Sequence, residues 1–453
     1  MVKTTDGDIR ALKEKLKKQG VRYALPAYVD MHGVSKGKSV PIEHLDRMMR
    51  GSELCTGAAL DGVPQEVTDE EVSAHPDPKS CTILPWNREV AWFASDLWCE
   101  GKPFEPCSRN TLKRQLAKAS DMGFSLNLGI ETEFFVLREN EKGDYVPVSE
   151  ADVMGKPCYD TRLLLHNYAW LDELVSSMNE LGWDVFSFDH EDTNGQFETD
   201  FMYANALTMA DRFTFFRLMV KEIARNHGLV ATFMPKPWPN RTGSAAHYNM
   251  SLADKRTGKN LFDSKTDRRK CGLSELGYHF IAGVLKHSHA ICAVTSPLVN
   301  SYKRLVKQGS MTGFTWAPVF ACYGGNNRTN MLRIPLGGGR VECRSTDIAC
   351  NMYLGAAMML AAGLEGIRKK MDPGAPHMEN MYAKTDAELK KAGIRLLPRR
   401  LDEALDHFEA DPLSKEVFGG TMFKAWLEYK RAEWHDYHNH ISDWERARYF
   451  AMF

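Results

Sequence analysis

The chain has 453 residues, of which 43% are hydrophobic and 26% charged, and its formal net charge is -1. This length allows a large hydrophobic core and predicts two domains. Because the charge balance is nearly neutral, it gives no electrostatic footprint for nucleic acid or for an anionic membrane surface, and we expect neither as a partner.

Ten cysteines are scattered along the chain without a CxxC pair or a histidine-flanked zinc spacing. The first residues also lack the apolar segment of a secretory signal, so we expect reduced thiols in a cytoplasmic protein. The most apolar stretch, 349–364, is shorter than the roughly 20 residues that span a bilayer. It therefore predicts a buried helix rather than a membrane span.

The first hundred residues predict a small α+β domain. Apolar spacing predicts a helix over 8–19, and strands are expected over 21–29 and 35–41. Short strands and proline-rich loops continue to a boundary near 103–106, after which Ser108 is expected to cap a helix over 109–122. We therefore place the first domain at 1–104 and the second at 105–453.

In the second domain, predicted helices and strands alternate, and several strands carry polar residues at every second position. That pattern indicates a sheet with one face lining a wet cavity, and the whole favours one large catalytic domain built on an antiparallel sheet packed by helices. Helices are expected over 163–181, 204–227, 274–292, 352–370 and 421–437, and strands over 126–137, 183–189, 196–200, 229–234, 246–253, 331–335 and 340–345.

Two glutamates interrupt the otherwise apolar strand predicted over 130–137. Glu131 and Glu133 lie two residues apart, so their side chains share one face, with Cα atoms roughly 6 to 7 Å apart. Like charges on the inner face of a hydrophobic strand are costly unless a positive charge lies between them, and a divalent cation is the simplest candidate. Taken alone, the pair also fits an exposed edge strand with two solvated glutamates.

Further candidate ligands recur downstream. Glu191 and Glu198 stand at the two ends of a turn-rich segment and could converge on one hard cation, although a solvated acidic loop has the same pattern. His247 alternates with Asn249 and Ser251 on one predicted strand, where a lone histidine could equally be a satisfied core residue. Glu342 and Arg344 form a last pair, two apart, that could be a structural ion pair.

Arginines supply the complementary charge, since a guanidinium donates two parallel hydrogen bonds to phosphate or carboxylate. The sequence contains no GxxxxGK[ST] loop, no GxGxxG after a strand and no kinase HRD or DFG arrangement. A nucleotide would therefore be held by metals and arginines rather than by a glycine-rich loop. The arginines concerned are Arg304, Arg328, Arg333, Arg340 and Arg344.

The order of these motifs resembles the glutamine synthetase family, and more closely its type III branch, which includes γ-glutamylmethylamide synthetase. The resemblance covers nearly the whole chain. It rests on six motifs in sequence: Glu131-Thr132-Glu133; Asp189-His190-Glu191 with Gln196-Phe197-Glu198; Phe233 to Pro237 leading to His247-Tyr248-Asn249-Met250-Ser251; Tyr302-Lys303-Arg304-Leu305; Asn327-Arg328 with Arg333-Ile334-Pro335; and Val341-Glu342-Cys343-Arg344.

The resemblance implies two or more cations, Mg²⁺ or Mn²⁺, at each site. One would be held near the amino-acid substrate and the other would bridge the phosphates of ATP. The implied ligands are Glu133, Glu191 and Glu198 for the first cation, and Glu131, His247 and Glu342 for the second.

The resemblance also implies roles around the substrates. Arg304, Arg344 and Gly243 would hold L-glutamate, Arg328 and Arg333 would neutralise the transferred phosphoryl group, and Ser251, with Asn249 on the same strand, would lie near ATP. Asp61, from a neighbouring subunit, and Tyr159 would border the ammonium pocket. The implied catalytic set is Asp61, Glu191, Arg304, Arg328 and Arg333.

The implied fold is an N-terminal β-grasp domain followed by a large catalytic domain with a curved antiparallel sheet, in a two-ring homododecamer with sites between subunits. The implied reaction is phosphorylation of the γ-carboxylate of glutamate by ATP, followed by attack of an amine on the acyl phosphate to give the γ-amide. Positioning and charge neutralisation would provide the catalysis.

One segment departs from the bacterial pattern. Where the family's active-site flap carries a glutamate, 309–318 places Trp316. An aromatic ring could pack against a methyl substituent or hold an alkylammonium. Ammonia is the acceptor expected from the breadth of the family, and methylamine, as in γ-glutamylmethylamide synthetase, is the alternative. Two other readings are a catalytically silent homologue, which predicts lost metal ligands, and a guanidino phosphotransferase, which needs no amine.

Overall fold

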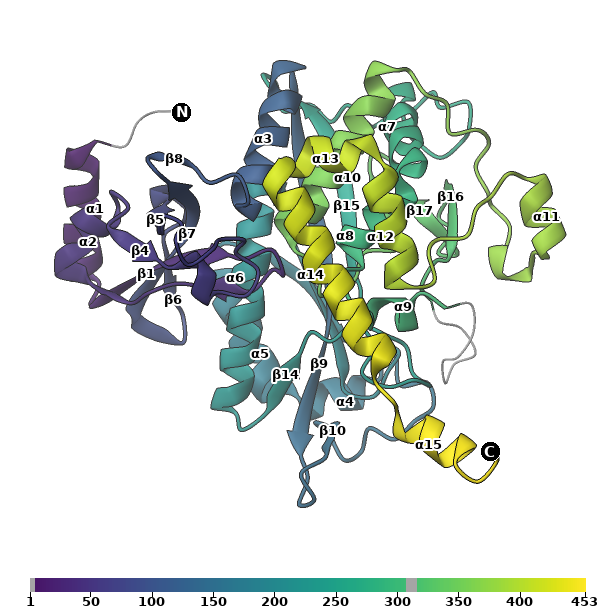
Figure 1. Cartoon of the computed structure of the whole chain (residues 1–453), viewed down its shortest axis with the longest axis horizontal. Helices are drawn as coiled ribbons and strands as arrows, with labels where there is room; N and C mark the ends of the chain where they lie inside the picture. The colour runs from purple at the N-terminus through teal and green to yellow at the C-terminus, as the bar shows by residue number, and fades with distance from the viewer. Residues whose placement is uncertain (1–4, 307–315) are drawn as a thin grey trace.

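The computed structural model describes residues 5–306 and 316–453, and two sheets dominate this part of the chain (Figure 1). In the first sheet β1 and β7 pair in parallel at the centre, and helix α1 packs its buried Ile9 and Leu16 into the core beside them. The described strands of this sheet are β1 (Tyr23–Val29), β2 (Ser35–Lys36), β3 (Val40–Pro41), β4 (Glu53–Cys55), β5 (Val72–Pro76), β6 (Thr82–Leu84), β7 (Asn87–Cys99) and β8 (Lys102–Pro103).

The second sheet runs in the order β11-β12-β9-β15-β18-β17-β16, with β10, β13 and β14 also paired to the long β9. Its described pairs are antiparallel except β16 with β17. Its strands are β9 (Phe124–Glu139), β10 (Tyr145–Pro147), β11 (Val185–His190), β12 (Gln196–Phe201), β13 (Ala204–Asn205), β14 (Val230–Thr232), β15 (Ala246–Asp254), β16 (Phe320–Gly325), β17 (Asn330–Ile334) and β18 (Val341–Cys343).

Helices cover this sheet on one side, while the yellow α14 crosses the molecule in Figure 1. None of the described helices is both long and apolar enough to cross a membrane. The helices are α1 (Asp6–Lys18), α2 (Leu45–Met48), α3 (Ser108–Asp121), α4 (Thr161–His166), α5 (Tyr168–Glu180), α6 (Ala206–Asn226), α7 (Glu275–Lys286), α8 (Ser288–Thr295), α9 (Ser301–Arg304), α10 (Met352–Arg368), α11 (Asp386–Lys391), α12 (Leu401–Ala410), α13 (Pro412–Phe418), α14 (Gly420–Asn439) and α15 (Asp443–Tyr449).

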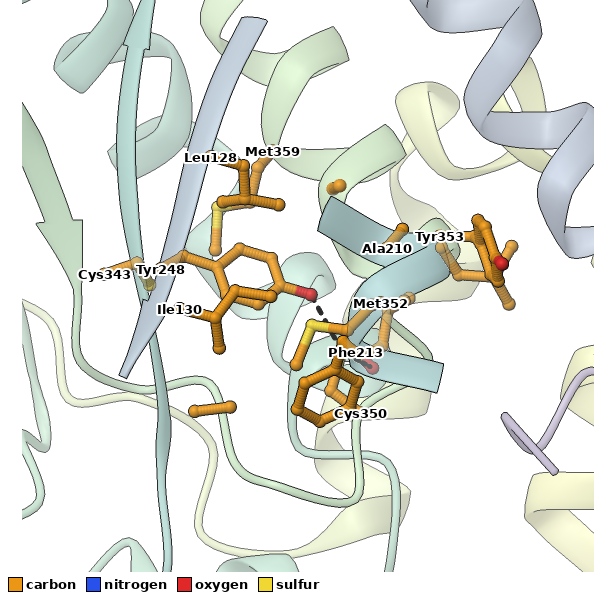
Figure 2. Packing of buried hydrophobic residues seen from close by; sticks show 14 of the residues in the cluster. Leu128, Ile130, Ala210, Phe213, Tyr248, Cys343, Cys350, Met352, Tyr353 and Met359 are labelled. Atoms are coloured by element: carbon orange, nitrogen blue, oxygen red, sulfur yellow. Dashed lines mark hydrogen bonds between the residues drawn. The ribbon is translucent and has the colours of Figure 1, made fainter. Parts of the chain in front are cut away.

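The core lies between the second sheet and helices α6 and α10. Leu128 and Ile130 of β9 meet Phe213 of α6 and Met359 of α10, and the Tyr248 hydroxyl is 3.5 Å from Cys350 Sγ (Figure 2). Since side chains alternate along a strand, this packing turns the odd-numbered positions of β9 toward the opposite face. That opposite face carries the glutamates.

Most predicted elements are present, and the differences have local causes. The helix predicted over 163–181 is two helices, because Asn167 ends α4 by donating from Nδ2 to the carbonyl of Leu163 at 2.7 Å. The helix predicted over 274–292 is likewise divided at His287 into α7 and α8. The strand predicted over 35–41 is two short strands, β2 and β3. Helices α2, α9, α11 to α13 and α15 and strands β10 and β16 were not predicted.

The capping role expected of Ser108 is wrong. Ser108 is the first residue of α3, and Cys107 occupies the cap position without a side-chain hydrogen bond. The hydroxyl of Ser108 instead donates to the carbonyl of Asp30 at 3.2 Å and accepts from Asn351 Nδ2 at 2.9 Å. A tertiary contact between the first sheet and α10 thus replaces the local cap.

Arg109 connects the first sheet to helix α6 through a buried ionic network. Its guanidinium donates to Asp77 and Asp96 beside the first sheet, at 2.9 Å each, and to both oxygens of Asp211 on α6, at 2.9 and 3.0 Å. Its side chain is only 3% exposed, and Tyr353 gives Asp211 a further hydrogen bond. Asp96 also pairs with Lys113, whereas Asp211 is buried and has Arg109 as its cation, so loss of Arg109 leaves buried negative charge uncompensated.

We expect Arg109→Met to lower the free energy of unfolding by about 3 to 5 kcal/mol, the usual cost of breaking a buried ion pair. Urea denaturation measures this change. The matched control is Arg88→Met, which removes an arginine from the exposed pair with Glu180 and should cost about 1 kcal/mol or less. Equal effects of the two substitutions would contradict a special role for the buried network.

Candidate active site

Strand register brings the candidate ligands to one face of the second sheet. In the ladder between β9 and β12, Glu133 lies opposite Glu198, and in the ladder between β9 and β15, Glu131 lies opposite His247. Glu342 of β18 completes this face from the next strand. Opposed residues of an antiparallel pair have Cβ atoms about 4.5 to 5.5 Å apart, so these ladders alone fix the spacing of most of the ligand groups.

The first cluster joins Glu131, His247 and Glu342, whose ligand atoms lie within 4.8 Å of one another. His247 Nδ1 is 3.0 Å from Glu131 Oε2 and 3.5 Å from Glu342 Oε1. Burial and the neighbouring Arg344 hold the pKa of His247 well below its ordinary value. The imidazole is therefore neutral and keeps a lone pair for a cation.

The second cluster joins Glu133, Glu191 and Glu198, again within 4.8 Å. Burial raises the pKa of Glu133 to about 7 and that of Glu191 to about 8, where the neighbouring carboxylates add to the rise. Burial and the charge of Glu191 also raise the pKa of Glu198 well above its usual range. Without a cation, these groups hold protons that free carboxylates release.

Both clusters have the chemistry of divalent-cation sites. Hard cations such as Mg²⁺ and Mn²⁺ take carboxylate oxygens, and Mn²⁺ also accepts imidazole nitrogen. Two buried oxygens beside the second cluster, Oδ1 of Asp189 and Oε1 of Gln196, have no hydrogen-bond partner among the described residues. The residues present thus fit the two cations that the sequence resemblance implies.

A cavity of about 450 Å³ opens over the second cluster and is lined by arginines as well as carboxylates. Arg344 donates to Glu342, and Arg333 Nη1 donates to the other oxygen of that carboxylate at 2.6 Å. Arg304 is held by the carbonyls of Arg344 and Ser345 at 3.0 and 3.2 Å. The predicted residues that line this cavity are Glu131, Glu133, Tyr159, Glu191, Glu198, Gly243, His247, Arg304, Trp316, Arg328, Arg333 and Arg344.

A second cavity, of about 610 Å³, lies on the other side of Glu131 and is lined by Asn249, Ser251 and Arg340. Asn249 Nδ2 donates to Glu131 Oε1 at 2.8 Å, and Arg340 Nε donates to Asn249 Oδ1 at 3.0 Å. Phe186 and Tyr203, both more than half exposed, add apolar wall. Its size and mixed lining suit a nucleotide-sized ligand.

Glu131 is therefore shared between the two cavities, whereas Glu133 lines only the smaller one. The two cavities lie along the same face of β9 and meet at Glu131; the larger one is partly aromatic and the smaller one is rich in charge. Glu342 lines neither cavity, because it is fully buried beneath Arg333 and Arg344.

Two predicted features stand apart. Asp61 lies in the N-terminal part of the chain, 3.5 Å from His32, and lines neither of the two cavities described above. The segment 309–315 of the predicted flap lies outside the described residues. Trp316 follows this segment, is 41% exposed and lines the smaller cavity. Its backbone carbonyl accepts a hydrogen bond from Arg344 Nη2 at 3.4 Å.

Sequence reasoning missed several acidic groups at the site. Asp200 lines the larger cavity, and burial raises its pKa to about 7. Because it lies two residues after Glu198 on β12, the same alternation that paired Glu131 with Glu133 could have found it. Asp192 and Thr242 line the smaller cavity and are hydrogen-bonded to each other. No local signal in the sequence indicates that contact.

Comparison with known proteins agrees with this geometry. A family model described as the glutamine synthetase catalytic domain matches residues 105–449. The chain is 42% identical over 439 residues to a glutamate–methylamine ligase of Methyloversatilis universalis, covering 97% of this chain and 98% of that protein. It is 39% identical over 430 residues to a glutamine synthetase of Rhizobium leguminosarum bv. phaseoli, covering 94% and 96%.

Solved structures are similar along the same length. A complex of GmaS with ADP has a TM-score of 0.90 and 39% identity, covering 97% of this chain and 99% of that one. GmaS without ligand has a TM-score of 0.88 and 38% identity, with the same coverage.

The fold and these relationships define an ATP-dependent carbon–nitrogen ligase. More specifically, the chain belongs to the glutamine synthetase family. The resemblance, the α+β fold class and the enzyme class predicted from the sequence are confirmed.

The raised pKa values of the second cluster predict how stability depends on pH in the metal-free protein. Glu133 and Glu191 titrate near 7 and 8 when folded, against about 4.5 when unfolded. The folded protein thus holds more protons across this interval, so its stability should fall as the pH rises from about 5 to about 8. Thermal unfolding followed by circular dichroism at several pH values measures this fall.

Saturating Mg²⁺ or Mn²⁺ should flatten the dependence, because a bound cation stabilises the ionised carboxylates. Glu191→Gln, which removes one of the titrating groups, should flatten it in the absence of metal. A midpoint temperature that stays constant or rises over the interval in the metal-free protein would contradict this account of the cluster.

Proposed function

We propose that this enzyme joins L-glutamate to a small amine, with methylamine as the main acceptor, in a reaction driven by ATP. The observation that carries the proposal is the pair of metal-type clusters on one face of the second sheet. Members of both clusters line the smaller cavity, and Glu131 of the first cluster also lines the larger one. The larger cavity takes ATP, and the smaller, arginine-lined cavity takes glutamate and the amine. The phosphoryl group passes from ATP to glutamate where the two cavities meet, at Glu131, and the γ-amide then forms in the smaller cavity.

The proposed role of each side chain follows from its position in the site. Ser251 and Asn249 face ATP, and Glu131, His247 and Glu342 would hold the cation nearer to it. Glu133, Glu191 and Glu198 would hold the cation nearer to glutamate. When bound, the two cations would neutralise negative charge on the phosphates and the carboxylates.

Arginines complete the charge balance in the smaller cavity. Arg304 and Arg344 bind the carboxylates of glutamate, with Gly243 offering backbone contacts, while Arg328 and Arg333 face the phosphoryl group in transfer. Donors fixed before the reaction stabilise developing negative charge without reorganising, which is the main source of rate in phosphoryl transfer. The acyl phosphate then loses phosphate as the uncharged amine attacks its carbonyl carbon.

Trp316 supports methylamine as the acceptor. Trp316 is 41% exposed and lines the smaller cavity, which is also lined by Tyr159 and by the acidic residues Glu191 and Asp192. An acidic pocket attracts the protonated amine, and an aromatic face can bind its methyl group by cation–π attraction. The 42% identity to a glutamate–methylamine ligase agrees with this choice.

Ammonia is the second candidate acceptor, favoured by the 39% identity to a glutamine synthetase. We further propose that 1–104 and 105–453 act as separate domains, and that the enzyme is a homododecamer of two rings. In this assembly Asp61 of one subunit reaches the amine pocket of its neighbour. Asp61 lines neither cavity of its own chain, which supports that placement.

The acceptor series tests the proposal. Phosphate release from ATP is followed with glutamate and Mg²⁺ or Mn²⁺ while the acceptor is ammonia, methylamine, ethylamine or propylamine. We expect the highest kcat/KM with methylamine. Release that no amine increases would refute the ligase function, and a higher value with ammonia would select the second candidate.

Substitution at Trp316 separates the two acceptors within one protein. If cation–π attraction contributes about 1 kcal/mol, Trp316→Ala should lower kcat/KM for methylamine about fivefold relative to ammonia, since 1.4 kcal/mol is a factor of ten. Trp316→Phe is the matched control, because it keeps an aromatic face and should retain most of the preference. An unchanged ratio in Trp316→Ala would exclude the indole from acceptor selection.

A further inference from the structure

The loop between β11 and β12 carries Glu191 and leads directly into Glu198, yet its shape is set by a residue from a distant segment. Asp152 lies between β10 and α4 and is 5% exposed. Its Oδ2 accepts from His190 Nε2 at 2.8 Å and from the backbone N–H of Gly195 at 2.6 Å, while its Oδ1 accepts from Asn194 Nδ2 at 2.7 Å. One carboxylate thus binds both ends of the loop.

Gly195 shows how closely the loop is fitted. Its φ of +75° is in the left-handed region, and an added Cβ would lie 3.1 Å from the carbonyl oxygen of Val136. A side chain there would be strained and crowded, so the turn depends on glycine. The N–H that this turn presents is the one that Asp152 accepts.

His190 links Asp152 to Glu191 of the second cluster. Its Nδ1 lies 2.8 Å from the carbonyl oxygen of Glu191, and its own carbonyl accepts from the N–H of Tyr159 at 2.9 Å. The ring is completely buried. Neither Asp152 nor His190 lines the two cavities described above, so any effect on ligands passes through Glu191 and Tyr159, which do line one.

The same loop is connected to the segment that carries Gly243. Thr193 Oγ1 donates to the carbonyl of Thr242 at 3.0 Å, and Arg241 donates to Asn194 Oδ1. Asn194 therefore contacts Asp152 through its amide nitrogen and Arg241 through its oxygen. A change at Asp152 is expected to reach the glutamate side of the smaller cavity by this route.

A restraint of this kind is needed because of charge. Glu191 lies with Glu133 and Glu198 within 4.8 Å, and their mutual repulsion favours movement of the one ligand that stands on a loop. Glu133 and Glu198 are fixed by strand pairing, whereas Glu191 follows the end of β11. The hydrogen bonds of Asp152 and His190 oppose that movement.

We infer that Asp152 and His190 form a positioning pair that holds Glu191 in place for the cation of the second cluster; the inference rests on the metal assignment of the proposed function. Outer partners of metal ligands orient them, and their loss commonly costs 10- to 100-fold in metal affinity. The side-chain hydrogen bonds of the pair go to Glu191, Asn194 and Gly195, whereas Glu131, His247 and Glu342 stand on β9, β15 and β18. Its loss is therefore selective for one of the two cation sites.

Direct binding of Mn²⁺ to the full-length protein, measured by electron paramagnetic resonance, tests this inference without turnover. The wild type is expected to bind two ions per chain. Asp152→Ala should weaken one site at least tenfold and leave the other within about twofold. Asp152→Asn, which keeps an acceptor oxygen for His190, should lie between Asp152→Ala and the wild type.

Steady-state kinetics give a second readout. The KM for glutamate should rise in Asp152→Ala, whereas the KM for ATP at saturating metal should not change. The matched control is Glu150→Ala, which removes a carboxylate from the same segment. The Glu150 side chain is 83% exposed and pairs with Arg138. This control should match the wild type in both measurements.

The outcomes separate the two levels of the account. A wild type that binds no Mn²⁺ at the clusters would refute the metal assignment itself. If the wild type binds two ions and a folded Asp152→Asn or Asp152→Ala binds both equally well, the positioning pair is refuted. Equal weakening of both sites would also refute it, since that result indicates a general loss of structure; thermal unfolding of each variant identifies this case.

Discussion

Glu133, Glu191 and Glu198 place three carboxylates within 4.8 Å of one another in the lining of one cavity, with Glu133 buried and the other two partly buried. Their repulsion is the constraint on which the rest of the site depends, because burial and neighbouring charge raise the pKa of Glu191 to about 8. Bound cations would relieve this repulsion, and arginine side chains line the same cavity. The strands, the loop contacts and the buried arginines can be understood as means of keeping these charges together.

Strand β9 provides the geometry. Its even-numbered residues pack against α6 and α10, so Glu131 and Glu133 must face the other way, and pairing with β12 and β15 brings Glu198 and His247 opposite them. Within 5–306 and 316–453, Glu131 is the only residue that borders both cavities. A ligase that first phosphorylates one substrate and then joins it to another needs such a meeting point, where a phosphoryl group can pass between two binding regions.

Features that depend on neighbours in sequence were predictable. The period of two placed Glu131 and Glu133 on one face, and apolar spacing located α6, α10 and β15 within a few residues. Features that depend on distant contacts were not: Ser108 was expected to cap a helix but instead contacts Asp30 and Asn351. Nothing near Asp152 in the sequence indicates that its carboxylate binds a loop some forty residues away. The assignment of ligands to two separate cations came from the family resemblance, not from spacing.

The central claim is that the two clusters, each with one ligand from β9, are separate cation sites. Anomalous X-ray scattering from crystals of the enzyme grown with Mn²⁺ and ADP tests it most directly. The account predicts two manganese peaks in each subunit, one among Glu131, His247 and Glu342 and the other among Glu133, Glu191 and Glu198. A single peak shared by the clusters, or manganese bound away from both, would contradict it.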